Sequence, residues 1–180
     1  EPSAPVKATT KARPAKVMDV AATDRLPRAV NLAWKANPVG EEIEGYTISR
    51  ADKLEGPFRE TGSTRGVNAT RYTDQPSVGY DVLDGAVYYY RVAAVNLGQV
   101  AGEPSDAVTG KTKLAPAKVA GVTVSKGKVR EVALQWKANP EPDIASYAIY
   151  RSSTGAAGSF AKVASVNANT YALVDAKLDA

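Results

Sequence analysis

Trp34-Lys35-Ala36-Asn37-Pro38 recurs 102 positions later as Trp136-Lys137-Ala138-Asn139-Pro140. The string Pro-Ala-Lys-Val at residues 14–17 recurs at the same spacing at residues 116–119. A sequence that repeats itself at a fixed spacing encodes one structural unit more than once. The chain of 180 residues is therefore built from copies of one unit.

The repeat spacing predicts where these units begin and end. Glu-Pro-Ser at residues 1–3 returns at residues 103–105, so we expect residues 1–11 to be the last strand of a preceding repeat. Residues 12–112 are predicted to form a complete repeat, and residues 113–180 an incomplete one, because the chain is shorter than two full periods. The sequence thus predicts a piece of a longer array whose neighbouring repeats contact one another.

Apolar residues recur at every second position in short runs, which are separated by Pro, Gly, Asn and Asp. The first run covers residues 17–21 and is expected to be the first strand. Another run covers residues 30–34, and the strongest covers residues 88–94, where the even-numbered side chains are predicted to point inward. A period of two indicates β-strands with one buried face. About seven such runs in the complete repeat, and the recurrence of the unit, predict all-β, antiparallel β-sandwiches in tandem.

In order along the chain, these runs resemble the fibronectin type III repeat. Val30-Leu32-Trp34 and Val132-Leu134-Trp136 match its second strand, and Tyr46-Ile48-Arg50 matches its third. The Tyr-rich run at residues 88–96 and Gly-Glu-Pro-Ser at residues 102–105 match its last part. The resemblance implies that residues 113–180 lack the last two strands of the fold. The string Asn-Pro-Glu-Pro-Asp at residues 139–143 is similar to bacterial members, which implies a secreted, cell-surface or periplasmic protein.

The resemblance also implies which side chains fill the core. In this family the tryptophan of the second strand is buried, and Tyr88 would form the tyrosine corner, a hydrogen bond between a tyrosine hydroxyl and the backbone. We place in the core Trp34, Tyr46, Leu83, Tyr88, Tyr90, Trp136 and Tyr147.

The composition excludes several classes of chemistry. The chain has no His and no Cys, so it has no imidazole base, no thiolate nucleophile and no zinc site of the usual kind. No apolar run is long enough to span a membrane, so we expect no membrane insertion in this segment. We therefore predict a protein that is not an enzyme and binds no cofactor.

Two loops of the complete repeat carry candidate contacts for a partner. Residues 74–81, called the insert loop below, form a longer loop than most family members have at this position. The loop carries Tyr80 and Asp81. The alternative is a tolerated surface insertion. The loop of residues 96–102 corresponds to the adhesive loop of the family and carries Leu97, Gln99 and Val100, although it has no Arg-Gly-Asp.

A third candidate is the basic cluster Lys126, Lys128 and Arg130. Such a cluster can contact an acidic glycan, a membrane surface or nucleic acid, and the alternative is a charged hairpin end that only keeps the protein soluble. No aromatic residues interleave with these cations, so we expect no nucleic-acid binding.

Clustered carboxylates at Glu41, Glu42 and Glu44 invite a calcium-site interpretation. Their spacing fits no known calcium loop, and runs of Glu are usually solvated surface. We therefore predict no metal site.

Together these features predict a non-catalytic extracellular module that binds a protein or glycan at the cell surface, as part of an adhesive bacterial envelope protein. The alternative is a pure spacer attached to a carbohydrate-active or other secreted enzyme. Binding would use loops at the ends of the sandwich.

Overall fold

The computed structural model describes residue 3, residues 11–126 and residues 128–176. The chain divides into two compact units, unit 1 up to Ala115 and unit 2 from Pro116. Of the last strand predicted at residues 1–11, all but Ser3 and Lys11 lie outside the described residues. No helix in the described parts of the chain is long and apolar enough to cross a membrane.

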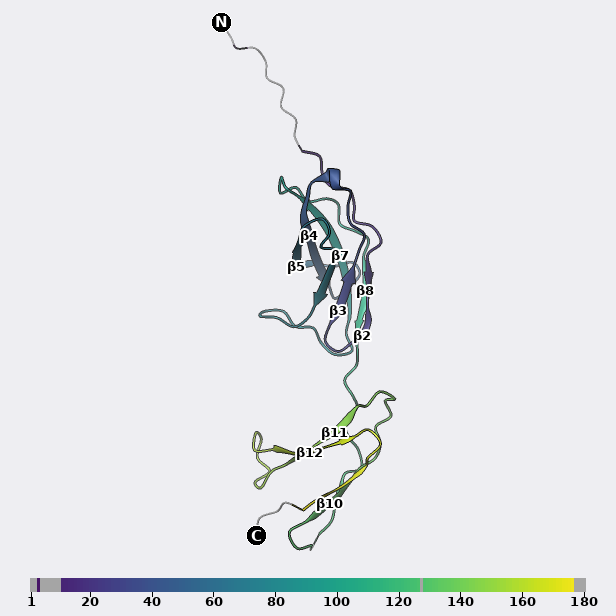
Figure 1. Ribbon diagram of the computed structural model, residues 1–180, viewed down its shortest axis with the longest axis vertical. Helices are drawn as coiled ribbons and strands as arrows, with labels where there is room; N and C mark the ends of the chain where they lie inside the picture. The colour runs from purple at the N-terminus through teal and green to yellow at the C-terminus, as the bar shows by residue number, and fades with distance from the viewer. Residues whose placement is uncertain (1–2, 4–10, 127, 177–180) are drawn as a thin grey trace. The chain divides into compact units, whose positions relative to one another are not determined.

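Unit 1 is a sandwich of two sheets. A three-stranded sheet has the order β1-β3-β6, and a five-stranded sheet has the order β2-β8-β7-β4-β5. Neighbouring strands are antiparallel except for the parallel pair β2 and β8. The long strands β4 and β7 lie side by side (Figure 1). The elements are β1 (Ala21–Ala22), β2 (Asp24–Leu26), β3 (Val30–Ala33), the 3-10 helix η1 (Val39–Glu41), β4 (Ile43–Ala51), β5 (Arg59–Arg65), β6 (Arg71–Asp74), β7 (Val87–Asn96) and β8 (Val108–Thr112).

The core of unit 1 lies between these sheets and follows the predicted alternation. Along β7 every second side chain is buried, starting at Tyr88. Tyr46 and Ile48 from β4 and Leu32 and Trp34 from the β3 region meet them. The all-β sandwich class predicted from the sequence is confirmed.

Two expectations for unit 1 are wrong. Leu83 was expected in the core, but its side chain is 55% exposed, and Val82 is buried instead. The backbone N–H of Leu83 donates to the Tyr88 hydroxyl oxygen at 2.9 Å, so Leu83 contributes its backbone to the tyrosine corner. The run starting at Val17 was expected to be the first strand, but β1 has only two residues, because Asp19 has a φ of 57° that interrupts the extended backbone.

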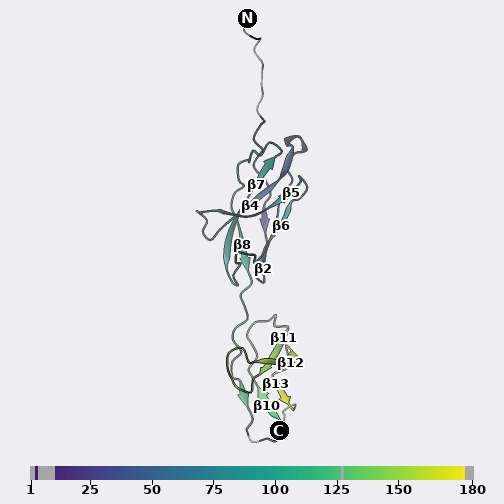
Figure 2. The same cartoon turned by 90° about the vertical axis from the view of Figure 1, so that its left-hand side faces the viewer.

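Unit 2 contains β9 (Thr123–Val124), β10 (Val132–Gln135), β11 (Ser146–Arg151), β12 (Ala161–Asn167) and β13 (Ala172–Asp175). They form a sheet of order β13-β10-β9 and a pair β11-β12 (Figure 2). In this order the strands match β1, β3, β4, β5 and β6 of unit 1; counterparts of β2, β7 and β8 are not found among residues 116–126 and 128–176. The buried core there is Trp136, Tyr147 and Ile149.

Within each unit, the two repeated strings form the same set of hydrogen bonds. In unit 1 the backbone N–H of Asn37 donates to the Tyr46 hydroxyl oxygen at 3.0 Å, and its side-chain amide donates to Ala15 O at 2.9 Å and to Glu41 Oε2 at 2.9 Å. The backbone N–H of Ala15 donates to the same carboxylate at 3.0 Å. These contacts, called the Asn37 network below, fix the segment that enters the repeat onto the loop after Trp34.

Unit 2 has an equivalent set, called the Asn139 network. Asn139 donates its backbone N–H to the Tyr147 hydroxyl oxygen at 3.0 Å and its side-chain amide to Ala117 O at 2.7 Å. The backbone N–H of Ala117 donates to Glu141 at 2.6 Å, and this bond lowers the pKa of the Glu141 carboxyl.

Candidate functional site

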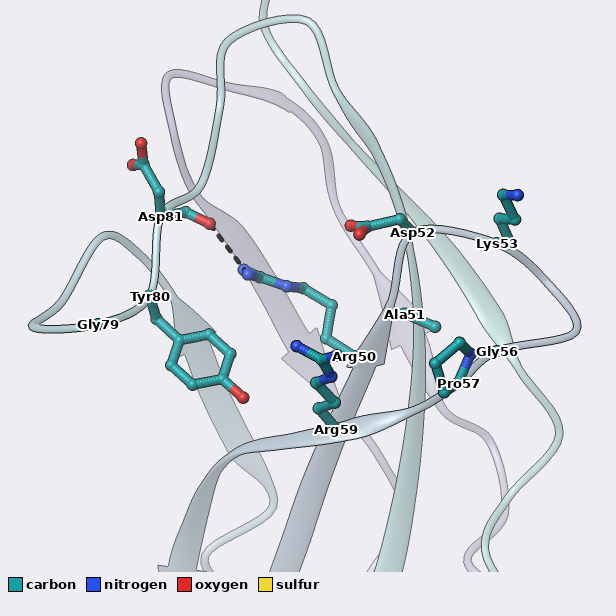
Figure 3. Close-up of a pocket in the computed structure, with 10 residues that line it drawn as sticks. All are labelled: Arg50, Ala51, Asp52, Lys53, Gly56, Pro57, Arg59, Gly79, Tyr80 and Asp81. Atoms are coloured by element: carbon teal, nitrogen blue, oxygen red, sulfur yellow. Dashed lines mark hydrogen bonds between the residues drawn. The ribbon is translucent and has the colours of Figure 1, made fainter.

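A pocket of about 520 Å³ opens at one end of unit 1. The hairpin loop between β4 and β5 forms one wall, and the insert loop forms the other (Figure 3). The side chains of Arg50 and Arg59 extend into the space between these walls (Figure 3). The lining residues are Arg50, Ala51, Asp52, Lys53, Gly56, Pro57, Arg59, Gly79, Tyr80 and Asp81.

Arg50 holds the pocket to the core of the sandwich. Its guanidinium donates to Asp74 Oδ2 at 2.8 Å and to the carbonyl oxygen of Asp81 at 2.9 Å. It also lies over two aromatic rings, 5.4 Å from the centroid of Tyr80 and 4.6 Å from that of Tyr88. One side chain at the end of β4 thus fixes both ends of the insert loop.

The carboxylate of Asp74 is buried and has a second donor, because the Tyr90 hydroxyl donates to Asp74 Oδ2 at 2.8 Å. Burial, followed by the charge of Asp74, raises the pKa of Tyr90 above its ordinary value. Burial lowers the pKa of Arg50, but the hydrogen bond and charge of Asp74 outweigh it and the net shift is upward. Arg50 therefore stays charged at neutral pH, and Tyr90 stays a donor.

The insert loop has further anchors of its own. Arg28 donates to the carbonyl oxygen of Val82 at 3.0 Å and to the Asp81 carboxylate. Ser77 and Tyr80 exchange two backbone hydrogen bonds, and the Tyr80 hydroxyl donates to the carbonyl oxygen of Glu60 at 2.8 Å. These hydrogen bonds hold the wall of the pocket in one conformation, which lowers the entropic cost of binding a ligand.

Three charged groups of the pocket remain available to a ligand. Asp52, Lys53 and Arg59 are exposed, and none of them forms an ion pair within the described parts of the chain. Arg50 and Asp81 are matched by Asp74 and Arg28. The lining groups without an ion-pair partner are therefore two cations and one carboxylate. Their net positive charge attracts an anion.

The structure separates the predicted binding loops of unit 1. Tyr80 and Asp81 line the pocket, beside the end of β4 that pairs Ala51 with Tyr89. The loop after Asn96 lies at the other end, where Ile43 pairs with Asn96. Nine strand residues separate the two ends, which is roughly 30 Å.

The loop of residues 97–100 is ordered around the buried Asn96. The side-chain oxygen of Asn96 accepts the backbone N–H groups of Gly98 and Val100 at 3.0 and 3.1 Å. Gln99 donates its side chain to Glu44, and Leu97 remains exposed. This loop presents an apolar side chain to solvent, but none of its residues lines the pocket.

The basic cluster lies in unit 2, between β9 and β10. Lys126, Lys128 and Arg130 are exposed, and Lys128 forms an ion pair with Glu131 at 2.8 Å. The carboxylates at Glu41, Glu42 and Glu44 do not converge, since each has a different partner: the Asn37 network, Lys11 and Gln99.

Sequence reasoning missed the cationic part of the pocket. Lys53 and Arg59 carried no signal because isolated basic residues are common on surfaces. Arg50 and Asp74 did carry one, because they recur as Arg151 and Asp175, both 101 positions later. A repeated pair of opposite charges at a constant spacing is a cue for an ion pair, and both pairs form, each at 2.8 Å.

No protein-family model and no curated protein matches this chain. Among solved structures, it is similar to the FN1–FN3 domains of chicken CNTN1, with 18% identity and a TM-score of 0.52 over 94% of this chain and 59% of that one. It is also similar to domains of titin, with 25% identity and a TM-score of 0.46 over 56% of this chain and 32% of that one. A β-1,2-glucanase from Parabacteroides distasonis matches with 24% identity and a TM-score of 0.40, over 57% and 13%. The chain spans about three fifths of the CNTN1 structure, and that likeness shows a fibronectin type III fold.

Proposed function

We propose that this chain is a non-catalytic binding module of a bacterial surface protein and that it contributes to adhesion. Domains with this fold generally serve as binding or spacer modules. The absence of His and Cys from the sequence supports a role without acid-base or thiolate catalysis. The style of residues 139–143 supports a bacterial, extracellular setting.

The observation that carries the proposal is the ordered pocket at one end of unit 1. Its walls are loops on a rigid sandwich, the arrangement in which binding residues are usually presented. The volume of about 520 Å³ lies within the usual range of ligand sites. Arg50, Arg28 and Tyr80 hold the insert loop in place, which supports a ligand-contacting loop over a tolerated surface insertion.

A solid-phase binding panel tests this function. The full chain is applied to immobilised fibronectin, collagen and polysaccharides, and we expect retention on at least one at micromolar concentration. Tyr80→Ala should weaken that retention at least about tenfold, because it removes an ordered aromatic contact at the pocket. Val39→Ala, which changes an exposed apolar residue of η1 at the other end of unit 1, is the matched control and should leave it unchanged. Silence across the panel would contradict adhesion.

The alternative function is a spacer, and a separate observation favours it. The segment that enters unit 1 is tied to the sandwich by the Asn37 network, by the Asn96 side chain, which donates to Ala12 O at 3.0 Å, and by the ion pair of Lys11 with Glu42. These contacts fix residues 11–15 to the sandwich, and a fixed entering segment supports a spacer role. A silent panel would favour this alternative.

A further inference from the structure

We propose that the pocket between the β4–β5 hairpin loop and the insert loop binds an acidic saccharide, whose carboxylate pairs with Arg59 and whose ring packs against Tyr80, while Lys53 adds a second positive charge to the lining. The inference rests on the proposed binding function and names the chemical class of its ligand.

The charge of the pocket selects an anion. Arg59 and Lys53 lie on opposite sides of the cis Gly56–Pro57 bond, in β5 and in the hairpin loop, and both line the pocket. Neither has an ion-pair partner within residues 11–126 and 128–176. A guanidinium binds a carboxylate through two parallel hydrogen bonds, and a nearby ammonium adds a charge without directional demands.

The rest of the lining selects a ring that carries hydroxyl groups. Asp52 is a hydrogen-bond acceptor next to the two donors, so the pocket offers both kinds of partner that a sugar hydroxyl requires. Figure 3 shows Tyr80 on the insert-loop side of the pocket and Pro57 on the hairpin-loop side, with the Arg59 side chain between them. The C–H face of a sugar ring is apolar and packs against such rings. Tyr80 is already fixed by its bond to Glu60 and by Arg50, so little entropy is lost when a ligand meets it.

An acidic peptide fits the same region less well. A peptide that binds next to an exposed strand usually adds its backbone to the sheet edge. The edge strand here is β5, and its carbonyl oxygens at Glu60 and Thr61 already accept the hydroxyl groups of Tyr80 and Tyr72, both at 2.8 Å. A peptide could therefore offer only side chains to the pocket, whereas a saccharide needs no backbone contact.

The test is isothermal titration calorimetry of the full chain with trigalacturonate, which carries one carboxylate on each ring. We expect saturable binding that weakens as salt is raised from about 50 to about 500 mM, because the cations are exposed. Arg59→Ala should weaken binding about tenfold, the usual effect of losing a charge-assisted hydrogen bond. Lys53→Ala should weaken it less. Arg65→Ala, which removes an exposed arginine at the far end of the same strand, should have no effect.

Neutral galactotriose and hexaglutamate complete the experiment. Equal binding of galactotriose would show that the carboxylate is not recognised, and equal binding of hexaglutamate would show that the ring is not; either result overturns the inference. No binding of trigalacturonate, or binding that Arg59→Ala leaves unchanged, also overturns it. If the panel retains the chain on a protein and Arg59→Ala keeps that retention, the proposed function stands and only the ligand class falls.

Discussion

Units 1 and 2 carry the same strings of sequence in two different surroundings. Trp34 and Trp136 each contact the tyrosine of the following strand, with ring centroids 5.3 and 5.6 Å apart. In unit 1 the tryptophan belongs to a core of twelve buried apolar residues, whereas in unit 2 the core has three. The local geometry is therefore encoded locally, while the depth of the core depends on β7 and Val82, which have no counterpart among the described residues of unit 2.

The two ion pairs show the same difference. Arg50 and Asp74 have side chains that are 11% and 3% exposed, because β7 covers them and supplies the Tyr90 hydroxyl. Arg151 and Asp175 repeat the pair at the same 2.8 Å, where the aspartate side chain is 11% exposed but the arginine side chain is 41% exposed. An identical contact thus lies in a low-dielectric setting in one unit and near water in the other, and the two should differ in energy.

The largest expected difference follows from these ion pairs. Asp74→Ala leaves the Arg50 charge buried and should lower the free energy of unfolding of unit 1 by about 4 kcal/mol. Asp175→Ala should lower that of unit 2 by at most about 1 kcal/mol, since water can solvate Arg151. Hydrogen exchange of the full chain under increasing urea measures both, because peptides from β4 and β11 report on their own units.

Asp106→Ala is the control, because it removes an ion pair whose carboxylate is exposed to solvent. It removes the exposed pair with Lys16, which lies 2.7 Å away, and should change stability by less than about 1 kcal/mol. Equal losses for Asp74→Ala and Asp175→Ala would mean that burial by β7 does not set the strength of the pair.

The second comparison concerns the core. Ile48 and Ile149 occupy matching positions in β4 and β11, and Ile48 is fully buried among residues of β3 and β7. Ile48→Ala should cost about 3 kcal/mol, because the closely packed site cannot collapse around the cavity. Ile149→Ala should cost about 2 kcal/mol, the low end of the range for such changes, since fewer contacts are lost there. The same hydrogen-exchange experiment measures both. A larger loss in unit 2 would show that its core is packed more tightly than its three buried residues imply.

Much of the fold could be predicted from the sequence because it depends on periodicity. The alternation in residues 88–94 locates β7 and its buried face, and the repeated tryptophan locates β3 and the loop after it. The failures have local causes. Asp19 adopts a left-handed conformation that a hydrophobicity pattern cannot reveal, and the choice between Val82 and Leu83 depends on how the chain turns into β7.

The candidate site could be predicted only in part. Tyr80 and Asp81 were identified from the length of the insert loop, but Lys53 and Arg59 come from another segment, and only tertiary structure brings them together. Gln99 and Val100 were grouped with Tyr80 as loop residues, although the sandwich places them at its other end. A pattern of single residues cannot show which end of a strand a loop occupies until the strand order is known.

The smallest expected difference concerns the two asparagine networks, which should be alike because they depend only on local contacts. Asn37→Ala and Asn139→Ala each remove side-chain bonds to the entering segment and should each cost about 1–2 kcal/mol in their own unit. The supporting glutamate stands four positions after Asn37 but two after Asn139, so both loops reach the same contacts from different spacings. Hydrogen exchange of the peptides that follow Pro14 and Pro116 measures the effect, with Lys35→Ala as an exposed control next to the first network. A clear effect in only one unit would contradict local encoding, because the network would then owe its strength to the surrounding core.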